Sequence, residues 1–253
     1  MAFSLRVRSL TLCGLILLAN VSYSSAQASP ASPTLTSQPS VAPAPHTSDT
    51  PDLLRETQQG LREPGFAGLV WWIPFEFWID SGLKRGNSAE KTTHDLGALK
   101  DYTVVVLFAA QVSPLGSFTF TAPSDLEKKV VLRDHNGEEY GSILNPSQDA
   151  KTLATVLRPV LGNALGKAGE NSEMIFFPAR GHDGRLIADP TAKGSFSVVV
   201  KDILGVPQSI YAWRTPLTSV AAPKHCPIGK ELMHADWDYC PWHGAKLDEP
   251  VKP

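Results

Sequence analysis

Short runs of β-branched and aromatic residues, separated by turn signals, recur along most of this chain and constrain its fold more than any other feature. Residues 102–108 are apolar on both faces, which predicts a central strand. Asn136-Gly137 predicts the tight turn of a hairpin that joins residues 130–133 to residues 138–143. About seven or eight such strands predict a mostly β fold over residues 52–222, an antiparallel β-sandwich of the immunoglobulin-like kind. The other runs are residues 118–121, 174–178, 196–200 and 210–214.

The most aromatic segment is residues 69–79. Every odd position from Leu69 to Ile79 is apolar, as in a strand, and tryptophans at even positions make the other face apolar as well. Pro74 cannot donate a hydrogen bond to a sheet, so we expect an edge strand or a strand bent at this proline. The aromatic face could bind a ligand or pack in the core, and packing is the more common use of such residues. The polar residues 80–100 predict a long loop.

Helical character is confined to two short segments. Residues 51–60 begin with a proline and end with a glycine, which predicts a short helix. Within the β domain, Ser147 is a suitable N-terminal cap for a helix over residues 147–157, which has an apolar face. Pro159 should break or kink that helix. The sequence therefore predicts a short helical insertion in the β-sandwich.

Two Cys-Pro turns near the C-terminus nearly repeat each other. The sequence Cys-Pro-Ile-Gly-Lys-Glu-Leu, from Cys226, is followed by Cys-Pro-Trp-His-Gly-Ala-Lys-Leu, from Cys240. Such turns are tight knuckles, in which a glycine lets backbone amides close around a thiolate. Two facing knuckles supply ligands for a tetrahedral ion, and thiolates with imidazole suit zinc. The stretch therefore predicts a zinc site.

The second knuckle is complete and the first is not. Cys240 and His243 have Cys-x2-His spacing, whereas Cys226 has no second Cys or His in its own knuckle. The sequence favours His234 as the fourth ligand, because the residues after it would then form the strand that leads back to the second knuckle. His225 is the alternate ligand, and water is a further alternative.

The stretch resembles a zinc ribbon, a small C-terminal module of many bacterial proteins with paired Cys-Pro-x-Cys-Gly knuckles. It also resembles a variant in which Cys-Pro-x-Gly-His leads to a Trp and then to Cys-Pro-x-Cys. The ligand His of that variant is Lys230 here, and the last Cys of the family is His243 here. The resemblance implies a small zinc ribbon over residues 223–253. In such families the ribbon is usually structural or a docking surface and is seldom catalytic.

Three other interpretations of these residues stay open. Cys226 and Cys240 are the only cysteines outside the N-terminal signal segment, so they could form a disulfide in an oxidising compartment. The loop from Tyr239 to His243 is similar to the copper loop of cupredoxins, although no methionine follows at the expected place. Cys-Pro-Trp-His is also similar to a thioredoxin-type redox motif, which needs to open a helix within a βαβ unit.

The N-terminal residues have the features of a signal peptide over residues 1–28. Two arginines form a basic region, an apolar run follows at residues 10–18, and Ala26-Gln27-Ala28 fits the small-x-small cleavage rule. We therefore expect cleavage near Ala28 and an exported mature chain, periplasmic or secreted. Residues 29–51 are rich in Pro, Ser and Ala and predict a disordered tether. No later run is apolar and long enough for a transmembrane segment.

The charge balance of the chain and its lack of common catalytic motifs limit the classes of function that it can have. Without its two N-terminal arginines the chain keeps 21 basic residues against 25 acidic ones, which disfavours nucleic-acid binding. No nucleophile elbow, phosphate-binding loop or His-Glu-x-x-His motif is present. His135 and His182 lie in glycine-bearing turns and could share a metal only if these turns meet.

Two functions remain. The first is a non-catalytic exported binding or assembly protein, with a structural zinc and an unknown protein or envelope partner. The second is a metal-dependent enzyme or copper electron carrier that uses Cys240 and His243, or the two turn histidines.

Overall fold

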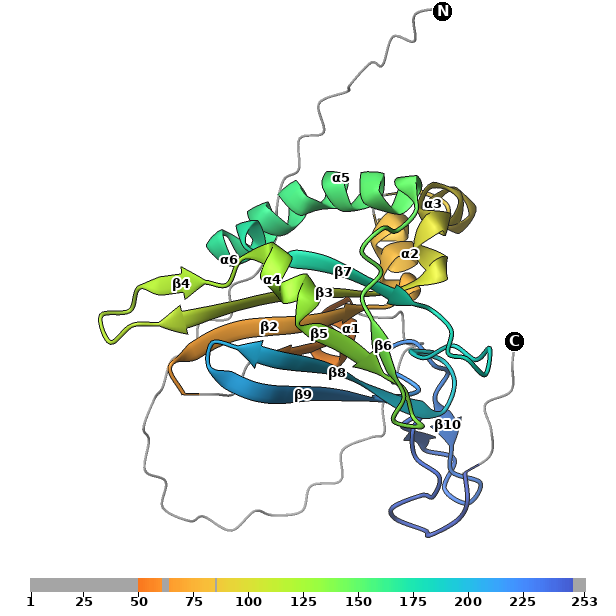
Figure 1. The fold of residues 1–253 in the computed structure, drawn as a ribbon. Helices are drawn as coiled ribbons and strands as arrows, with labels where there is room; N and C mark the ends of the chain where they lie inside the picture. The colour runs from red at the N-terminus through yellow and green to blue at the C-terminus, as the bar shows by residue number, and fades with distance from the viewer. Residues whose placement is uncertain (1–49, 61–63, 85, 248–253) are drawn as a thin grey trace, which may run out of the picture. The chain divides into compact units, whose positions relative to one another are not determined.

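The computed structural model describes residues 50–60, 64–84 and 86–247. The predicted signal peptide and nearly all of the predicted tether lie outside the described residues. The described chain is mostly β, with antiparallel sheets, several helices and no closed barrel among its described residues (Figure 1).

The larger sheet has five strands in antiparallel pairing. Its order is β1-β2-β3-β4, and β7 also pairs with β3. Residues Tyr102 to Leu107 of β3 pair with β7, and Ala110 to Val112 pair with β4. These two short strands therefore follow one another along the same long strand. The bounds are β1 (Gln58–Gly60), β2 (Phe66–Ile73), β3 (Tyr102–Val112), β4 (Phe118–Phe120) and β7 (Glu173–Pro178).

The smaller sheet has four strands in the order β6-β5-β8-β9, and all its pairs are antiparallel. The predicted hairpin at Asn136-Gly137 joins β5 to β6 and is confirmed. Gly137 has a φ of 86°, a conformation that glycine adopts without strain. The bounds are β5 (Val130–Arg133), β6 (Glu139–Gly141), β8 (Gly194–Ile203) and β9 (Val206–Thr215).

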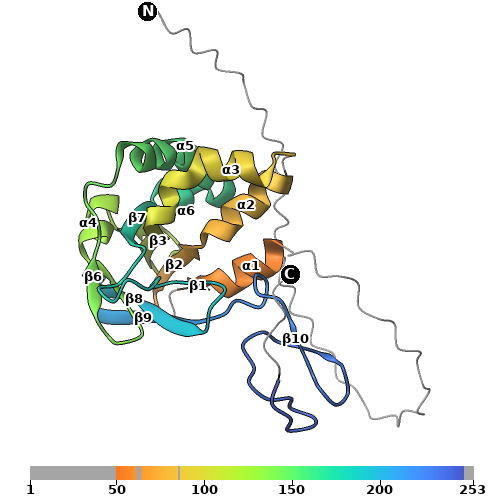
Figure 2. The same ribbon diagram turned by 90° about the vertical axis from the view of Figure 1, so that its right-hand side faces the viewer.

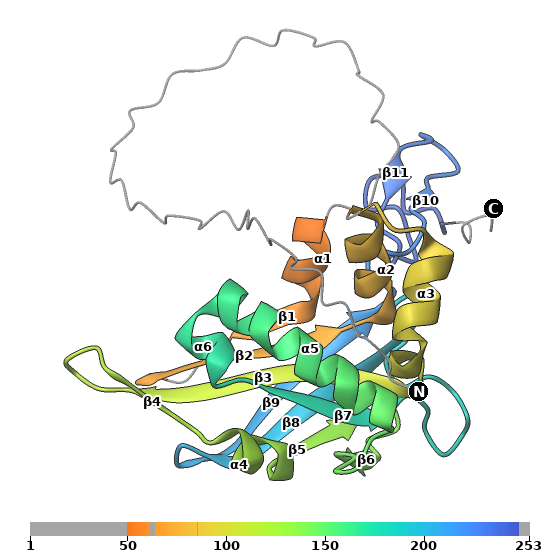
Figure 3. The ribbon, with the colours of Figure 1, turned by 90° about the horizontal axis from the view of Figure 1, so that it is seen from above.

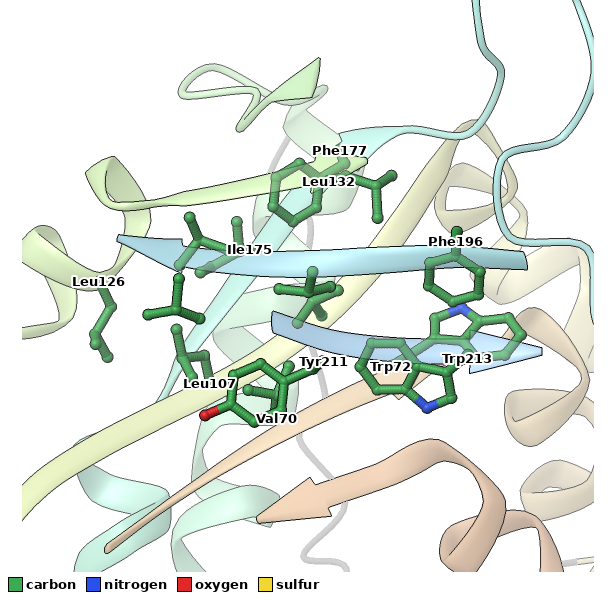
Figure 4. Packing of buried hydrophobic residues seen from close by; sticks show 14 of the residues in the cluster. Val70, Trp72, Leu107, Leu126, Leu132, Ile175, Phe177, Phe196, Tyr211 and Trp213 are labelled. Atoms are coloured by element: carbon green, nitrogen blue, oxygen red, sulfur yellow. The ribbon is translucent and has the colours of Figure 1, made fainter. Parts of the chain in front are cut away.

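One hydrophobic cluster takes side chains from both sheets (Figure 4). Trp72 of the larger sheet packs edge-on against Phe196 of the smaller one, with ring centroids 4.7 Å apart. Phe196 in turn stacks on Trp213 of the neighbouring strand at 5.3 Å. This face of the larger sheet is therefore covered by the smaller sheet.

A second cluster covers the opposite face of the larger sheet. Strand side chains alternate, so Val104 and Val106 face this cluster while Val105 and Leu107 face the first. Helix α5 lies over β3 and β7 on this side (Figure 3). The helices are α1 (Thr50–Thr57), α2 (Phe75–Lys84), α3 (Ala89–Leu96), η1 (Gly97–Asp101), α4 (Pro123–Lys128), α5 (Gln148–Leu165) and α6 (Lys167–Glu170).

The prediction of one strand over residues 69–79 is wrong, and so is the long loop predicted at residues 80–100. The strand ends at Ile73 and α2 begins two residues later, because Pro74 cannot extend the ladder and its carbonyl accepts from Phe77 N at 3.1 Å. A segment that is apolar on every side fits a packed helix as well as a strand. The aromatic side chains are core residues, as the packing interpretation held, with exposures of 7% for Trp71, 1% for Trp72 and 9% for Trp78.

The predicted helical insertion is present but longer than expected. Ser147 caps α5 by accepting from Ala150 N, as predicted, whereas Pro159 lies inside the helix without ending it. The expectation that the β domain holds a single helical segment is wrong, since α2, α3 and α4 also belong to it.

The last described residues form a small unit with its own short hairpin, β10 (Lys224–His225) and β11 (Leu232–Met233) (Figure 2). Its buried side chains, Cys226, Met233, Cys240 and Leu247, form a third cluster with Trp237 packed against them. The boundaries predicted at residues 222 and 223 stay predictions.

Candidate metal centre

Cys226, Cys240 and His243 converge at the centre of this C-terminal unit. Their ligand atoms all lie within 4.8 Å of one another, with both thiols buried and the imidazole exposed. Nδ1 of His243 lies 3.3 Å from Sγ of Cys226 and 3.4 Å from Sγ of Cys240. Sulfur and nitrogen ligands of a tetrahedral zinc ion stand about 3.5 Å apart, given zinc bond lengths of about 2.3 and 2.0 Å. The group therefore has the spacing that a metal ion needs.

Two backbone turns with the same hydrogen bonds hold these side chains. In the first, Lys230 N donates to Cys226 O at 2.9 Å, and Cys226 N donates to Glu231 O at 3.0 Å. In the second, Gly244 N donates to Cys240 O at 2.8 Å, and Cys240 N donates to the carbonyl oxygen five residues later, also at 2.8 Å. The knuckles are thus two copies of one backbone unit.

The backbone angles fix which positions of the two knuckles correspond. Lys230 and Gly244 both have a φ of 63°. Their equivalence means that Gly229 occupies the position of His243, rather than that of Gly244 as the letters of the near-repeat suggest. The first knuckle therefore has a glycine where the second has its histidine ligand.

The residues that follow the two knuckles are also equivalent in their pairing and packing. The His225–Leu232 pair of the first hairpin has its counterpart in the Tyr239–Lys246 bridge of the second. Met233 and Leu247 take equivalent places and are both buried beneath the cysteines. A few apolar side chains thus support the two thiols from below.

The surroundings of Cys226 favour a thiolate. Burial alone would raise the pKa of this thiol, but the backbone N–H groups of Gly229 and Ile228 and the side chains of Cys240 and His243 lower it further than burial raises it. The Gly229 N–H donates to Sγ at 3.4 Å. A lowered pKa matters because the thiolate is the form that binds a metal.

The other predicted ligands lie apart from this group. The ring of His234 packs against Trp237, with centroids 4.6 Å apart, and the side chain is exposed. His225 is an exposed residue of β10. Neither belongs to the group of mutually close ligand atoms. Both cysteines are free, and the imidazole nitrogen lies within 3.4 Å of each sulfur.

The turns that carry His135 and His182 are joined by a tyrosine. Tyr140 OH accepts from His182 N at 3.2 Å and donates to Asp134 Oδ2 at 3.2 Å, and the rings of Tyr140 and His182 lie 5.3 Å apart. His182 Nε2 also lies 3.4 Å from Glu138 Oε1. In the part of the chain that the structure describes, these residues do not form a set of three close metal ligands.

The prediction that backbone amides close around a thiolate is confirmed at Cys226, where Gly229 N donates to Sγ at 3.4 Å. Which amides these are was not predicted, although the Cys-Pro-x-x spacing could have indicated them. No helix among the described residues has both the length and the apolar character needed to cross a membrane. Comparisons of the chain with protein-family models, curated proteins and solved structures found no match.

Proposed function

We propose that the C-terminal unit is a ribbon-like zinc module on an exported binding or assembly protein. The observation that carries this proposal is the convergence of Cys226, Cys240 and His243 from two copies of one backbone turn. Zinc is the metal we assign, because two soft thiolates and an imidazole in tetrahedral spacing suit it.

The zinc of this module has a structural role. The unit rests on a cluster of four buried side chains and one partly buried tryptophan, which is a small core for an independent fold. Binding of a structural metal contributes directly to the folding free energy of such units. Both cysteine side chains are buried, as expected of metal ligands that stabilise a fold.

Binding rather than catalysis is supported by the surface of the module. Ile228 and Trp242 stand at the third position of the first and second knuckles and are 63% and 68% exposed; Tyr239, just before the second knuckle, is 62% exposed. Three exposed large apolar side chains on so small a unit favour a contact surface. We propose that they meet a protein or envelope partner.

The remaining chain supports an exported carrier for this module. The core cluster shared by the two sheets favours a β-sandwich, and the N-terminal residues favour export with cleavage near Ala28. N-terminal sequencing of protein from the cell envelope tests the export step. An uncleaved chain in the cytoplasm would refute it.

Metal analysis of the full mature protein, with an absorption spectrum, tests the zinc assignment. We expect about one zinc per chain and no strong visible band. Cys240→Ser should abolish zinc binding, whereas His225→Ala, in the same module but outside the group, should leave it intact. A strong visible copper–thiolate band would favour the electron carrier instead. Unreduced protein with neither metal nor free thiol would leave a Cys226–Cys240 disulfide.

A further inference from the structure

The first knuckle lacks a side chain at the position from which the second knuckle supplies its histidine. Gly229 and His243 are equivalent in the backbone hydrogen bonds of the two turns. The backbone of Gly229 is outside the left-handed region, so nothing in its conformation requires glycine. A Cys2His group leaves one position of a tetrahedral ion to be filled.

The carboxylate of Glu231 lies where the missing side chain would begin. A Cβ added to Gly229 would stand 2.0 Å from Oε1, 2.2 Å from Oε2 and 2.4 Å from Cδ of Glu231. The volume next to Gly229 is therefore occupied by the carboxyl group of Glu231 rather than by solvent. Carboxylate oxygens bind zinc at about 2.0–2.2 Å.

The second knuckle shows the complementary pair of residues. The position equivalent to Glu231 is Ala245, since the carbonyl oxygen of each accepts from the cysteine N–H of its own knuckle. The knuckle with a histidine at the ligand position has a small residue here. The knuckle with a glycine at the ligand position has a glutamate whose carboxylate occupies that place.

We propose that Glu231 supplies the fourth ligand of the metal, an inference that rests on the zinc site proposed above. Its carboxylate lies outside the group of mutually close ligand atoms, so binding requires rotation about the side-chain torsions of Glu231 to bring an oxygen to the metal. The side chain is exposed, and no hydrogen bond or ion pair is found for its carboxylate among the described residues. His234, by contrast, is packed against Trp237.

Zinc affinity of the full mature protein, measured by competition with a chromophoric chelator, tests this inference. Glu231→Ala should weaken zinc binding at least about tenfold, because loss of even an outer-shell partner costs about 10- to 100-fold. Asp236→Ala removes the same charge from an exposed position of the same module and should change the affinity little. His234→Ala should also have little effect.

A second variant keeps the test decisive if Glu231→Ala folds poorly. Gly229→Cys in the Glu231→Ala background places a thiolate at the empty ligand position and should restore zinc affinity to at least that of the natural protein. With cobalt in place of zinc, the thiolate charge-transfer absorption should rise, since three thiolates replace two.

The outcomes separate the two proposals. No zinc bound by the natural protein would overturn the metal module itself. Zinc bound equally well by the natural protein and by Glu231→Ala would overturn only the role of Glu231. Loss confined to His234→Ala would identify that histidine as the fourth ligand.

Discussion

Asp134 is a buried carboxylate that organises the turn between β5 and β6. Its Oδ1 accepts from Asn136 N at 2.8 Å and from Glu138 N at 2.9 Å, and its Oδ2 accepts from Tyr140 OH. Burial alone would raise its pKa, but the two backbone N–H groups, the tyrosine hydroxyl and the charge of His135 together hold the pKa below its usual value.

Asp134→Ala should therefore destabilise the protein at neutral pH by about 1–3 kcal/mol, since it removes the carboxylate that accepts from the Asn136 and Glu138 N–H groups. A carboxyl with a lowered folded-state pKa stabilises the fold above its unfolded pKa of about 3.9, and this contribution is lost as pH falls through the folded-state value. Urea unfolding at several pH values measures it. The gap between variant and natural protein should narrow in acid. A gap of constant size from neutral pH to acid would contradict the charge argument.

Spacing along the chain predicts some of these residues and misses others. The Asn136-Gly137 turn and the Cys240–His243 pair follow from local chemistry, and the structure contains both. The equivalence of Gly229 and His243 depends on backbone angles that the residue types do not indicate. Lys230 takes the positive-φ conformation that glycine takes in the second knuckle. The contact between Tyr140 and the turn at His182 joins positions 42 residues apart, which no local pattern indicates.

Among the helices, α5 and α6 pack through a glycine. A Cβ at Gly169 would stand 2.0 Å from Leu161 O and 2.8 Å from Gly162 N, both backbone atoms of α5. The helices therefore approach as closely as they do only because α6 has no side chain at this point.

Gly169→Ala should lower the free energy of unfolding by about 1–3 kcal/mol, the usual cost of an overpacked contact. Gly162→Ala is the matched control: the nearest atom to its added Cβ is Glu170 Cγ at 3.8 Å, so the alanine has room. That control should stabilise α5 by about 0.5–1 kcal/mol. Chemical denaturation of both variants measures the contrast, and equal effects would refute the close approach.

The elements that the sequence predicts well are those with a clear local signal. Strand β3 is a run of β-branched and other apolar residues, and helix α5 has a capping serine and an apolar face; both are found, although α5 extends past Pro159. Helix α2 was predicted as a strand, because residues 75–79 lie between two cores and are apolar in either period. Ser88, which caps α3 by accepting from Lys91 N, was an available signal for a helix in the predicted loop.

For the molecule as a whole, the C-terminal module has a core of its own. Its cluster shares no residue with the two clusters of the sheets. One contact between the parts is the ion pair of Lys193 with Asp238 Oδ2 at 2.6 Å, whose side chains are 70% and 51% exposed. Exposed pairs of this kind contribute about 0–1 kcal/mol. This ion pair therefore adds little to the stability of the sheets.

A chelator should consequently unfold the module and leave the sheets folded. Hydrogen exchange followed by mass spectrometry measures this directly: protection should be lost after about residue 223 and kept in β3 and β8. Cys240→Ser should reproduce the pattern without a chelator. Loss of protection in β3 as well would show that the metal supports the whole described chain.

The class of the fold was predictable, and the path of the chain through it was not. Alternating patterns indicated a mostly β chain with antiparallel strands, which the structure confirms. They could not indicate which strands share a sheet, because pairs such as Val105 with Ile175 join distant segments.

The order in which the chain visits its two sheets has a consequence for how it folds. After β3 and β4 of the larger sheet, the chain forms β5 and β6 of the smaller sheet. It then forms β7 of the larger sheet, followed by β8 and β9 of the smaller one. Val105 pairs with Ile175, and Val130 pairs with Val200, so both sheets join segments that are far apart in the sequence. The larger sheet is complete only once β7 follows, and the smaller sheet only once β8 and β9 follow. A chain that has been made only as far as β7 therefore has unpaired strand edges in the smaller sheet, and such non-local pairing is typical of slowly folding, aggregation-exposed topologies.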